Sequence, residues 1–288
     1  MQPSCVVRAE CLLGEGPLWD ADRRRLYWLD IKQRRLHWFE PASATTGAIE
    51  LDVQATALGR RGQGGFVMAC AGGVGTYDLD AFHFEWRVEI EHDKPGNRTN
   101  DGHVGHDGRF WFGTMADNGV DRTGALYRLD HDWRCTQVLN ALGIPNAIVT
   151  DAAAHTLYMA DSALSELYAY PLDAKTGALG EPRTLAATEA PITPDGAALD
   201  AEGFVWSAQW DGWRVVRYAP DGAVDRIVEL PVRRPTSCAF GGLHLRTLYI
   251  TSARVGLDAA ALAKEPLAGG LFALEVETPG LPLPLFAG

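Results

Sequence analysis

Residues 154–173 read AHTLYMADSALSELYAYPLD. The segment begins with a run of apolar and aromatic residues, continues with a short polar stretch, and ends with a second run in which apolar residues alternate with others up to Pro171 and Asp173. Alternation with a period of two is typical of a half-buried β-strand, and Pro and Asp are common where a strand gives way to a turn. The segment therefore predicts a strand, a short loop and a second strand.

The same order of segments recurs along the chain, so that the sequence contains six related repeats. Each copy begins with a turn rich in Asp, Gly or Arg and contains two apolar strands separated by a polar loop. Such repeats indicate a fold built from similar units, each of which buries its apolar face against its neighbours. The other copies are RRRLYWLDIKQRRLHWFEP (23–41), QGGFVMACAGGVGTYDLD (63–80), DGRFWFGTMADNGVDRTGALYRLD (107–130), EGFVWSAQWDGWRVVRYAPDG (202–222), and LRTLYITSARV followed by GGLFALEV (245–255 and 269–276).

The spacing of the repeats identifies the architecture. Successive copies are 40, 44, 47, 47 and 44 residues apart, and a period in the mid-forties with about four short strands per unit is typical of propeller blades. The sequence therefore predicts an all-β fold, a six-bladed β-propeller in which residues 1–288 form a single domain. We expect Val6 and Val7 to pair with the last blade and close the ring. The spacing is measured between strands aligned at Leu26, Phe66, Phe110, Leu157, Phe204 and Leu248.

Composition and charge exclude several classes of function. The chain of 288 residues has a formal net charge of −11 and a pI near 5.2. A nucleic-acid binder needs a basic face, and an anionic membrane surface would repel this chain, so we expect no nucleic acid and no membrane as partner. No segment resembles a signal peptide or a membrane span, and five cysteines without a Cys-x-x-Cys pair indicate free thiols. We therefore expect a cytoplasmic protein, and we expect it to be a monomer.

The blade register also points to a candidate site. In a four-stranded blade the first strand lines the central channel and precedes the aligned strand by about ten residues. Four blades carry Glu, Asn or Asp at these places, and the equivalent places in blades two and six carry Gln54 to Thr56 and Ser237. Asn or Asp before Gly is also an ordinary turn residue, so no single position shows whether its side chain belongs to a site or only to a turn. The common blade phase predicts that four side chains converge on one mouth of the channel: Glu15, Asn100, Asn146 and Asp195.

Side chains of this kind suit a divalent cation. Carboxylate and carboxamide oxygens, completed by water, are ligands for hard or borderline cations. Glu15 lies between Leu13 and Trp19 in an apolar setting, where a carboxylate needs a partner. We therefore expect one divalent metal ion as cofactor, and its identity stays open between calcium, zinc, manganese and iron(II).

The segment from 94 to 115, KPGNRTNDGHVGHDGRFWFGTM, places polar residues in a turn just ahead of a strand. Asn100 is predicted to face inward, with Arg98 beside it as a candidate substrate or carbonyl contact. Asp101 is predicted to stabilise the turn. The segment therefore combines one residue of the candidate site with ordinary turn chemistry.

Other catalytic signatures are missing from the sequence. There is no Gly-x-Ser-x-Gly elbow of a serine hydrolase, and no glycine-rich turn opens a helix as a phosphate loop would. His103 and His106 are three residues apart in a glycine-rich loop, but nothing helical surrounds them. We therefore expect no histidine metal site.

Five motifs follow one another along the chain: LGEGPLW (13–19), NRTNDG (97–102), DGRFWFGTM (107–115), IPNAI (144–148) and PDG (194–196). In this order they resemble the motifs of the gluconolactonase/regucalcin (senescence marker protein) family, and within it those of bacterial sugar lactone hydrolases. The likeness covers nearly the whole chain. It implies a six-bladed propeller that hydrolyses sugar lactones with one divalent metal ion.

The resemblance implies a role for three of the candidate residues at the metal. Carried over motif by motif, Glu15, Asn146 and Asp195 are the implied metal ligands. Asp195 is also the implied general base. These roles rest on the family resemblance and not on the blade register.

The resemblance also implies substrate contacts. Arg98 and Asn100 match the family's substrate-binding motif, and Asn118 stands where some relatives bind the sugar through an acidic residue. The chain departs from the family pattern at Ala147, where glycine is common, and at Thr99, where Pro or Phe is common.

Taken together, these features predict metal-dependent hydrolysis of a sugar (aldono-) lactone to the aldonic acid, with the cation polarising the carbonyl and positioning water. One alternative is a non-catalytic propeller that binds a divalent cation or a partner, although an interaction propeller needs no polar channel mouth. Another is a related propeller esterase or organophosphate hydrolase, which would need a more apolar pocket than the polar residues predicted here provide. The predicted small-molecule partner is a sugar lactone, and arabinono-, xylono-, galactono- and gluconolactone all stay open.

Overall fold

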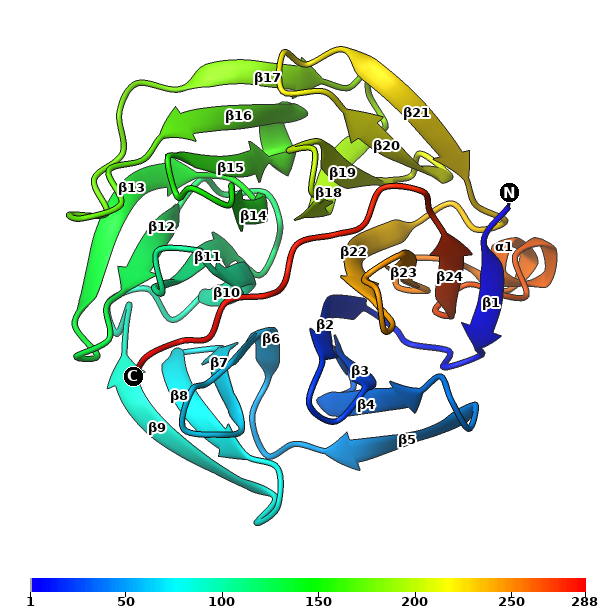
Figure 1. Cartoon of the computed structure of the whole chain (residues 1–288), viewed down its shortest axis with the longest axis horizontal. Helices are drawn as coiled ribbons and strands as arrows, with labels where there is room; N and C mark the ends of the chain where they lie inside the picture. The colour runs from blue at the N-terminus through cyan, green and yellow to red at the C-terminus, as the bar shows by residue number, and fades with distance from the viewer. Residues whose placement is uncertain (1) are drawn as a thin grey trace. The chain divides into compact units, whose positions relative to one another are not determined.

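The computed structural model describes residues 2–288, which fold almost entirely into β-strands. The strands form six antiparallel sheets of four strands each, so the predicted six-bladed β-propeller is confirmed (Figure 1). The six aligned positions from Leu26 to Leu248 each lie on, or directly before, the second strand of a sheet. The chain divides into two compact units, each with three of the sheets.

Unit 1 comprises the chain up to Leu51 together with Thr188–Pro282. Two of its first strands, β2 and β18, both contact the third first strand, β22. A short helix, α1 (Ala259–Lys264), lies between β23 and β24 in the chain. The sheets are β2 (Gly14–Asp20), β3 (Arg25–Asp30), β4 (Arg35–Glu40) and β5 (Thr45–Glu50); β18 (Thr193–Leu199), β19 (Val205–Trp210), β20 (Arg214–Tyr218) and β21 (Val224–Glu229); and β22 (Pro235–Gly241), β23 (Thr247–Ser252), β24 (Leu271–Glu275) and β1 (Ser4–Val7).

Unit 2 comprises Asp52–Ala187 and Leu283–Gly288. Its first strands are also neighbours, because β10 contacts both β6 and β14. A single 3₁₀ turn, η1 (Ser162–Leu164), follows β15. The sheets are β6 (Ala55–Arg60), β7 (Phe66–Cys70), β8 (Gly73–Asp78) and β9 (His83–Glu89); β10 (Asn97–Val104), β11 (Phe110–Ala116), β12 (Gly124–Leu129) and β13 (Cys135–Leu142); and β14 (Pro145–Thr150), β15 (Thr156–Asp161), β16 (Glu166–Pro171) and β17 (Arg183–Ala187).

The burial of each strand follows its position in the sheet. The second strand β11, FWFGTMA, is buried at every residue, whereas the fourth strand β9, HFEWRVE, has no buried residue. A strand whose two faces are both covered needs no polar side, so its sequence is a continuous apolar run. The outer fourth strands β9 and β21 are instead mostly exposed. The apolar runs in the repeats are therefore the second strands.

The strand nearest the N-terminus completes the last sheet. β1 pairs with β24 in an antiparallel ladder that sets Ser4 opposite Ala273 and Cys5 opposite Phe272, and the two ribbons lie side by side in Figure 1. The predicted closure near Val6 and Val7 is confirmed, since Val7 pairs with Leu271. This pairing covers the β24 edge that would otherwise be open to another chain.

A buried arginine side chain holds three acidic side chains together in unit 1. Arg217, on β20, is 6% exposed and donates from Nε to Asp200 at 2.8 Å. The same guanidinium bonds Glu202 at 2.6 Å and Asp225 at 2.7 Å, and it lies 3.7 Å from the centre of the Phe204 ring. Since Asp200 is fully buried, Arg217 supplies the charge that compensates its carboxylate.

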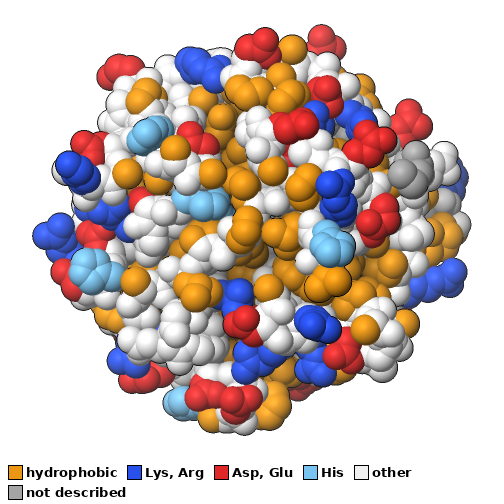
Figure 2. Space-filling model, in the orientation of Figure 1, with side chains coloured by type: hydrophobic (Ala, Val, Ile, Leu, Met, Phe, Trp, Pro, Cys, Tyr) orange, Lys and Arg blue, Asp and Glu red, His pale blue; other side chains and the backbone are white. Residues whose placement is uncertain are grey.

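The surface carries charged side chains of both signs. Figure 2 shows acidic and basic side chains interspersed over the face in view. Within residues 2–288, no helix has the length and apolar character that crossing a membrane requires.

Candidate functional site

Each first strand is irregular where the sequence predicted an inward-facing residue. The ladder between first and second strand shifts register there in every sheet of the described chain, as at a β-bulge. A bulge re-aims a side chain out of the regular ladder, and bulges are over-represented beside active sites. The residues at or inside the shifts are Glu15 in β2, Thr56 in β6, Asn100 in β10, Asn146 in β14, Asp195 in β18 and Ser237 in β22.

In unit 2 the structure brings three predicted residues into one hydrogen-bonded row. Asn100 Nδ2 donates to Asn146 Oδ1 at 2.8 Å and to Pro145 O at 3.1 Å. Asn100 Oδ1 accepts from Arg98 Nη1 at 2.8 Å, and Asn146 Nδ2 donates to Ser162 Oγ at 2.9 Å. These contacts set the orientation of both carboxamides. Asn146 Oδ1 keeps a second lone pair that can accept another partner.

Arg98 is fixed in place beside a pocket. Its Nε donates to Asp117 Oδ1 at 2.7 Å, and its Nη1 also donates to Thr99 O at 2.8 Å. No acceptor within residues 2–288 is bonded to Nη2. A pocket of about 580 Å³ in unit 2 is lined by Arg98 and by the β9–β10 connection, including Glu91 and Lys94. Arg98 can therefore present a pre-oriented donor to a ligand in this pocket.

Asn118 lies apart from this row. It is exposed, its Oδ1 accepts from the N–H of Val120 at 2.9 Å, and its Nδ2 donates to Asp121 at 2.8 Å, so the side chain closes its own turn. The preceding Asp117 contacts Arg98 instead. Sequence reasoning counted Asp117 among the polar groups of the pocket but did not predict its contact with Arg98, because a carboxylate in a loop carries no periodic signal that distinguishes a partner of arginine from a turn residue.

In unit 1 the two predicted carboxylates are both buried. Glu15 and Asp195 are 9% and 6% exposed, and each precedes a glycine that its surroundings require. Gly16 has a φ of 55°, and a Cβ on Gly196 would lie 2.2 Å from Ser237 Oγ. Buried carboxylates are donors that hard or borderline cations accept. The chemistry of these side chains therefore fits a divalent cation.

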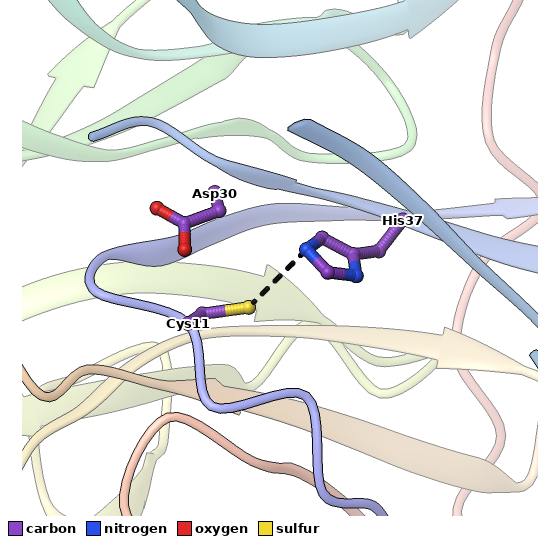
Figure 3. A group of neighbouring side chains, drawn as sticks. All are labelled: Cys11, Asp30 and His37. Carbon is purple, nitrogen blue, oxygen red and sulfur yellow. Dashed lines mark hydrogen bonds between the residues drawn. The ribbon is translucent and has the colours of Figure 1, made fainter. Parts of the chain in front are cut away.

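A second group of possible metal ligands in unit 1 consists of Cys11, Asp30 and His37 (Figure 3). Their ligand atoms lie within 4.8 Å of one another, and Cys11 Sγ is 3.7 Å from His37 Nε2. Burial raises the pKa of Cys11 to about 12 and lowers the pKa of His37, so a neutral thiol meets a neutral imidazole. A cation here would have to displace existing partners. The carboxylate of Asp30 already accepts the backbone N–H groups of Leu12, Leu13, Lys32 and Gln33.

His103 makes the stability of the folded state depend on pH. Burial, and then the nearby His106, lower the pKa of His103 to about 4. The unfolded chain binds this proton with a pKa of about 6.5, so the folded state loses stability as the pH falls from about 6.5 to about 4. The carboxyl of Asp101, whose pKa burial raises to about 6, acts in the opposite direction and is left unchanged by a substitution at His103.

We therefore expect His103→Gln to lose less stability than the wild type on acidification. Urea unfolding at pH 7 and at pH 4.5 measures the difference. The exposed His131 offers a matched control, and His131→Gln should keep the acid sensitivity of the wild type. Equal acid sensitivity in the two variants would contradict the assignment to His103.

Comparisons with known proteins cover the whole chain. The profile of the SMP-30/Gluconolactonase/LRE-like region matches residues 13–254. A 6-deoxy-6-sulfogluconolactonase of Pseudomonas putida is 40% identical over 99% of this chain and 98% of its own, and a pentonolactonase of Haloferax volcanii is 35% identical over 96% and 95%. The crystal structure of a calcium-binding regucalcin from Agrobacterium tumefaciens superposes with a TM-score of 0.95 at 31% identity, over 100% of this chain and 98% of that one. The chain belongs to the SMP-30/gluconolactonase/LRE-like family.

Proposed function

We propose that the protein is a sugar lactonase, a carboxylic ester hydrolase that opens an aldonolactone to the aldonic acid with one bound divalent cation. The observation that carries the proposal is the hydrogen-bonded row of Arg98, Asn100 and Asn146 on bulged first strands. The relatives from Pseudomonas putida and Haloferax volcanii, both named as lactonases, support the same reaction class.

Glu15, Asn146 and Asp195 are the residues that we assign to the cation. Two carboxylates and one carboxamide oxygen, all buried, support this assignment. When bound, a divalent cation supplies polarisation of the lactone carbonyl and a position for the attacking water. The regucalcin of Agrobacterium tumefaciens is described as calcium-binding, and zinc, manganese and iron(II) also accept such donors.

The remaining steps belong to side chains of this chain. Asp195 takes the proton of the attacking water at a carboxylate oxygen, as a general base. Arg98 Nη2 donates to a sugar oxygen, held in direction by Asp117 and Thr99. Asn100 Nδ2 has both hydrogens engaged, so its contact with the sugar uses the second lone pair of Oδ1. Substrate binding thus needs little rearrangement of this row.

The pocket beside Arg98 supports a substrate with a polar chain attached to the lactone ring. Its lining combines apolar surface from Trp86 and Ile90 with the charged side chains of Lys94 and Glu91. Such a lining suits a polyhydroxylated chain, whose C–H groups pack on apolar surface while its hydroxyls form hydrogen bonds. Pentonolactones and hexonolactones both offer such groups, so the proposal includes arabinono-, xylono-, galactono- and gluconolactone.

Metal analysis of protein purified without chelator, followed by a lactone panel on apo and reloaded protein, tests the proposed function. We expect about one divalent cation per chain, loss of hydrolysis on its removal and recovery on its return. The panel pairs pentono- with hexonolactones and includes an aryl ester and an organophosphate. Cation binding without turnover of any ester would favour the non-catalytic alternative. Faster hydrolysis of the aryl ester or the organophosphate would contradict the assignment of a sugar lactone as the substrate.

Arg98→Lys is expected to weaken substrate use. A lysine cannot satisfy Asp117, Thr99 and Asn100 and still direct a donor into the pocket. A charge-assisted hydrogen bond contributes about 1.5–3 kcal/mol, so kcat/KM should fall roughly 10- to 100-fold, mainly through KM. Steady-state kinetics on the best lactone measures this, with the exposed Arg87→Lys as control. An unchanged KM would remove Arg98 from substrate binding.

A further inference from the structure

Asp101 connects the two bulges that carry Asn100 and Asn146. It lies inside the bulge of β10, where its Oδ1 accepts the N–H of Gly102 at 2.8 Å. Its Oδ2 reaches into the next sheet and accepts the N–H of Ile148 at 3.1 Å, inside the bulge of β14. The N–H of Ala147 is also near enough to favour the charged carboxylate. One side chain thus holds the backbone of both bulges that carry the row.

The bulge of β14 needs this support for a reason visible in the backbone. Ala147 has a φ of 53°, in the left-handed region that costs an L-residue about 1–2 kcal/mol. In unit 1 the residue after Glu15 is Gly16, which adopts a φ of 55° without that cost. Asn146 therefore stands next to a strained residue, and its direction depends on contacts that keep the bulge in place.

The charge on Asp101 has no counterpart in the ladder. Among residues 2–288 its carboxylate forms no ion pair, and its partners are backbone N–H groups in the bulges of β10 and β14. A turn that only needed closing would be served by the bond to Gly102. The bond to Ile148, 47 residues away in sequence, acts on the segment that orients Asn146.

We propose that Asp101 is a positioning residue, which fixes the backbone after Asn146 and thereby aims the Asn146 carboxamide at the cation. The inference rests on the proposed function, because it takes Asn146 as a ligand. It assigns Asp101 no contact with the substrate. Its effect should appear first in cation affinity, since a ligand that is free to turn away binds its ion less well.

Titration of calcium and of manganese into apo protein by calorimetry tests the proposal without any use of activity. Asp101→Asn keeps the size of the side chain but leaves one oxygen to serve N–H groups in two strands. We expect its affinity for the cation to fall 10- to 100-fold. Adding Ala147→Gly should recover a large part of this loss, because glycine holds the left-handed conformation on its own. Asp101→Ser, which keeps an acceptor in a smaller side chain, serves if the asparagine variant does not fold.

Asp107→Asn is the matched control. Asp107 is a buried aspartate in the same unit that accepts from Arg109 and Trp111, so its loss should lower thermal stability without changing the affinity for the cation. Wild-type affinity in Asp101→Asn, or no recovery by Ala147→Gly, would make Asp101 a structural residue only. Asn146→Ala distinguishes a failure of the proposed ligand set from a failure of the role proposed for Asp101 alone. If it binds the cation as the wild type does, the proposed ligand set fails, and the role of Asp101 fails with it.

Discussion

Asp195→Asn should retain stoichiometric cation and lose most lactone hydrolysis, by about 10²–10⁴-fold in rate. Asparagine keeps an oxygen that can bind a cation but cannot take a proton from water. Asp195 is 6% exposed and lies in a bulge of β18, where Gly196 lets the strand approach Ser237 closely. An isosteric replacement should therefore preserve the local structure while it removes the base.

Acid release, corrected for spontaneous ring opening, measures the rate, and metal analysis of the same sample measures occupancy. The chain offers a matched control, because Pro-Asp-Gly occurs again at residues 220–222. Asp221 is exposed there and accepts only the N–H of Ala223 among the described residues, so Asp221→Asn should leave hydrolysis unchanged. A fully metallated Asp195→Asn with near-normal turnover would leave Asp195 as a ligand and assign the base to another group.

Arg217→Ala should cost about 3–5 kcal/mol of the free energy of unfolding, the largest stability loss that we expect from a residue outside the site. Removal of the guanidinium leaves the fully buried Asp200 without its compensating charge, and it separates Glu202 and Asp225 from their common partner. The ring of Phe204 also loses the flat cation that covers it.

Equilibrium unfolding in urea measures this loss. Arg226 is the control, because it lies opposite Arg217 on β21, is exposed and has no ion pair among residues 2–288. Arg226→Ala should change stability by no more than about 0.5 kcal/mol. A similar result for Arg217→Ala would mean that water replaces the guanidinium around Asp200.

The sequence predicted the fold because the fold repeats. A single strand such as FWFGTMA is ambiguous, but six copies at a constant phase locate the second strand of every sheet. Counting back by about ten residues then reaches the bulges that hold Glu15, Asn100, Asn146 and Asp195. The phase of the repeat thus carried information on the site as well as on the fold.

Contacts between loops were beyond such reasoning. Asp117 and Asn118 are adjacent polar residues in one turn, and only the coordinates distinguish the one that holds Arg98 from the one that closes the turn. Asp101 was expected to stabilise a turn, but it lies within strand β10, where it accepts the N–H of Gly102 in the bulge, and its bond to Ile148 joins two repeats. Local turn chemistry is visible in a sequence, whereas the partner of a side chain in another sheet is not.

The pairing of β1 with β24 also determines the order in which the sheets can be completed during synthesis. Ser4 and Ala273 are opposite one another in the ladder, so a ribosome working at about 5–20 residues per second needs roughly 15–50 s between making the two. During that interval β1 has no strand to join, and contacts this distant in sequence are slow to form even in a complete chain. The nascent protein can assemble five sheets from neighbouring strands, but the sixth must wait for its most distant partner. The strand that is made first is thus among the last to find its place.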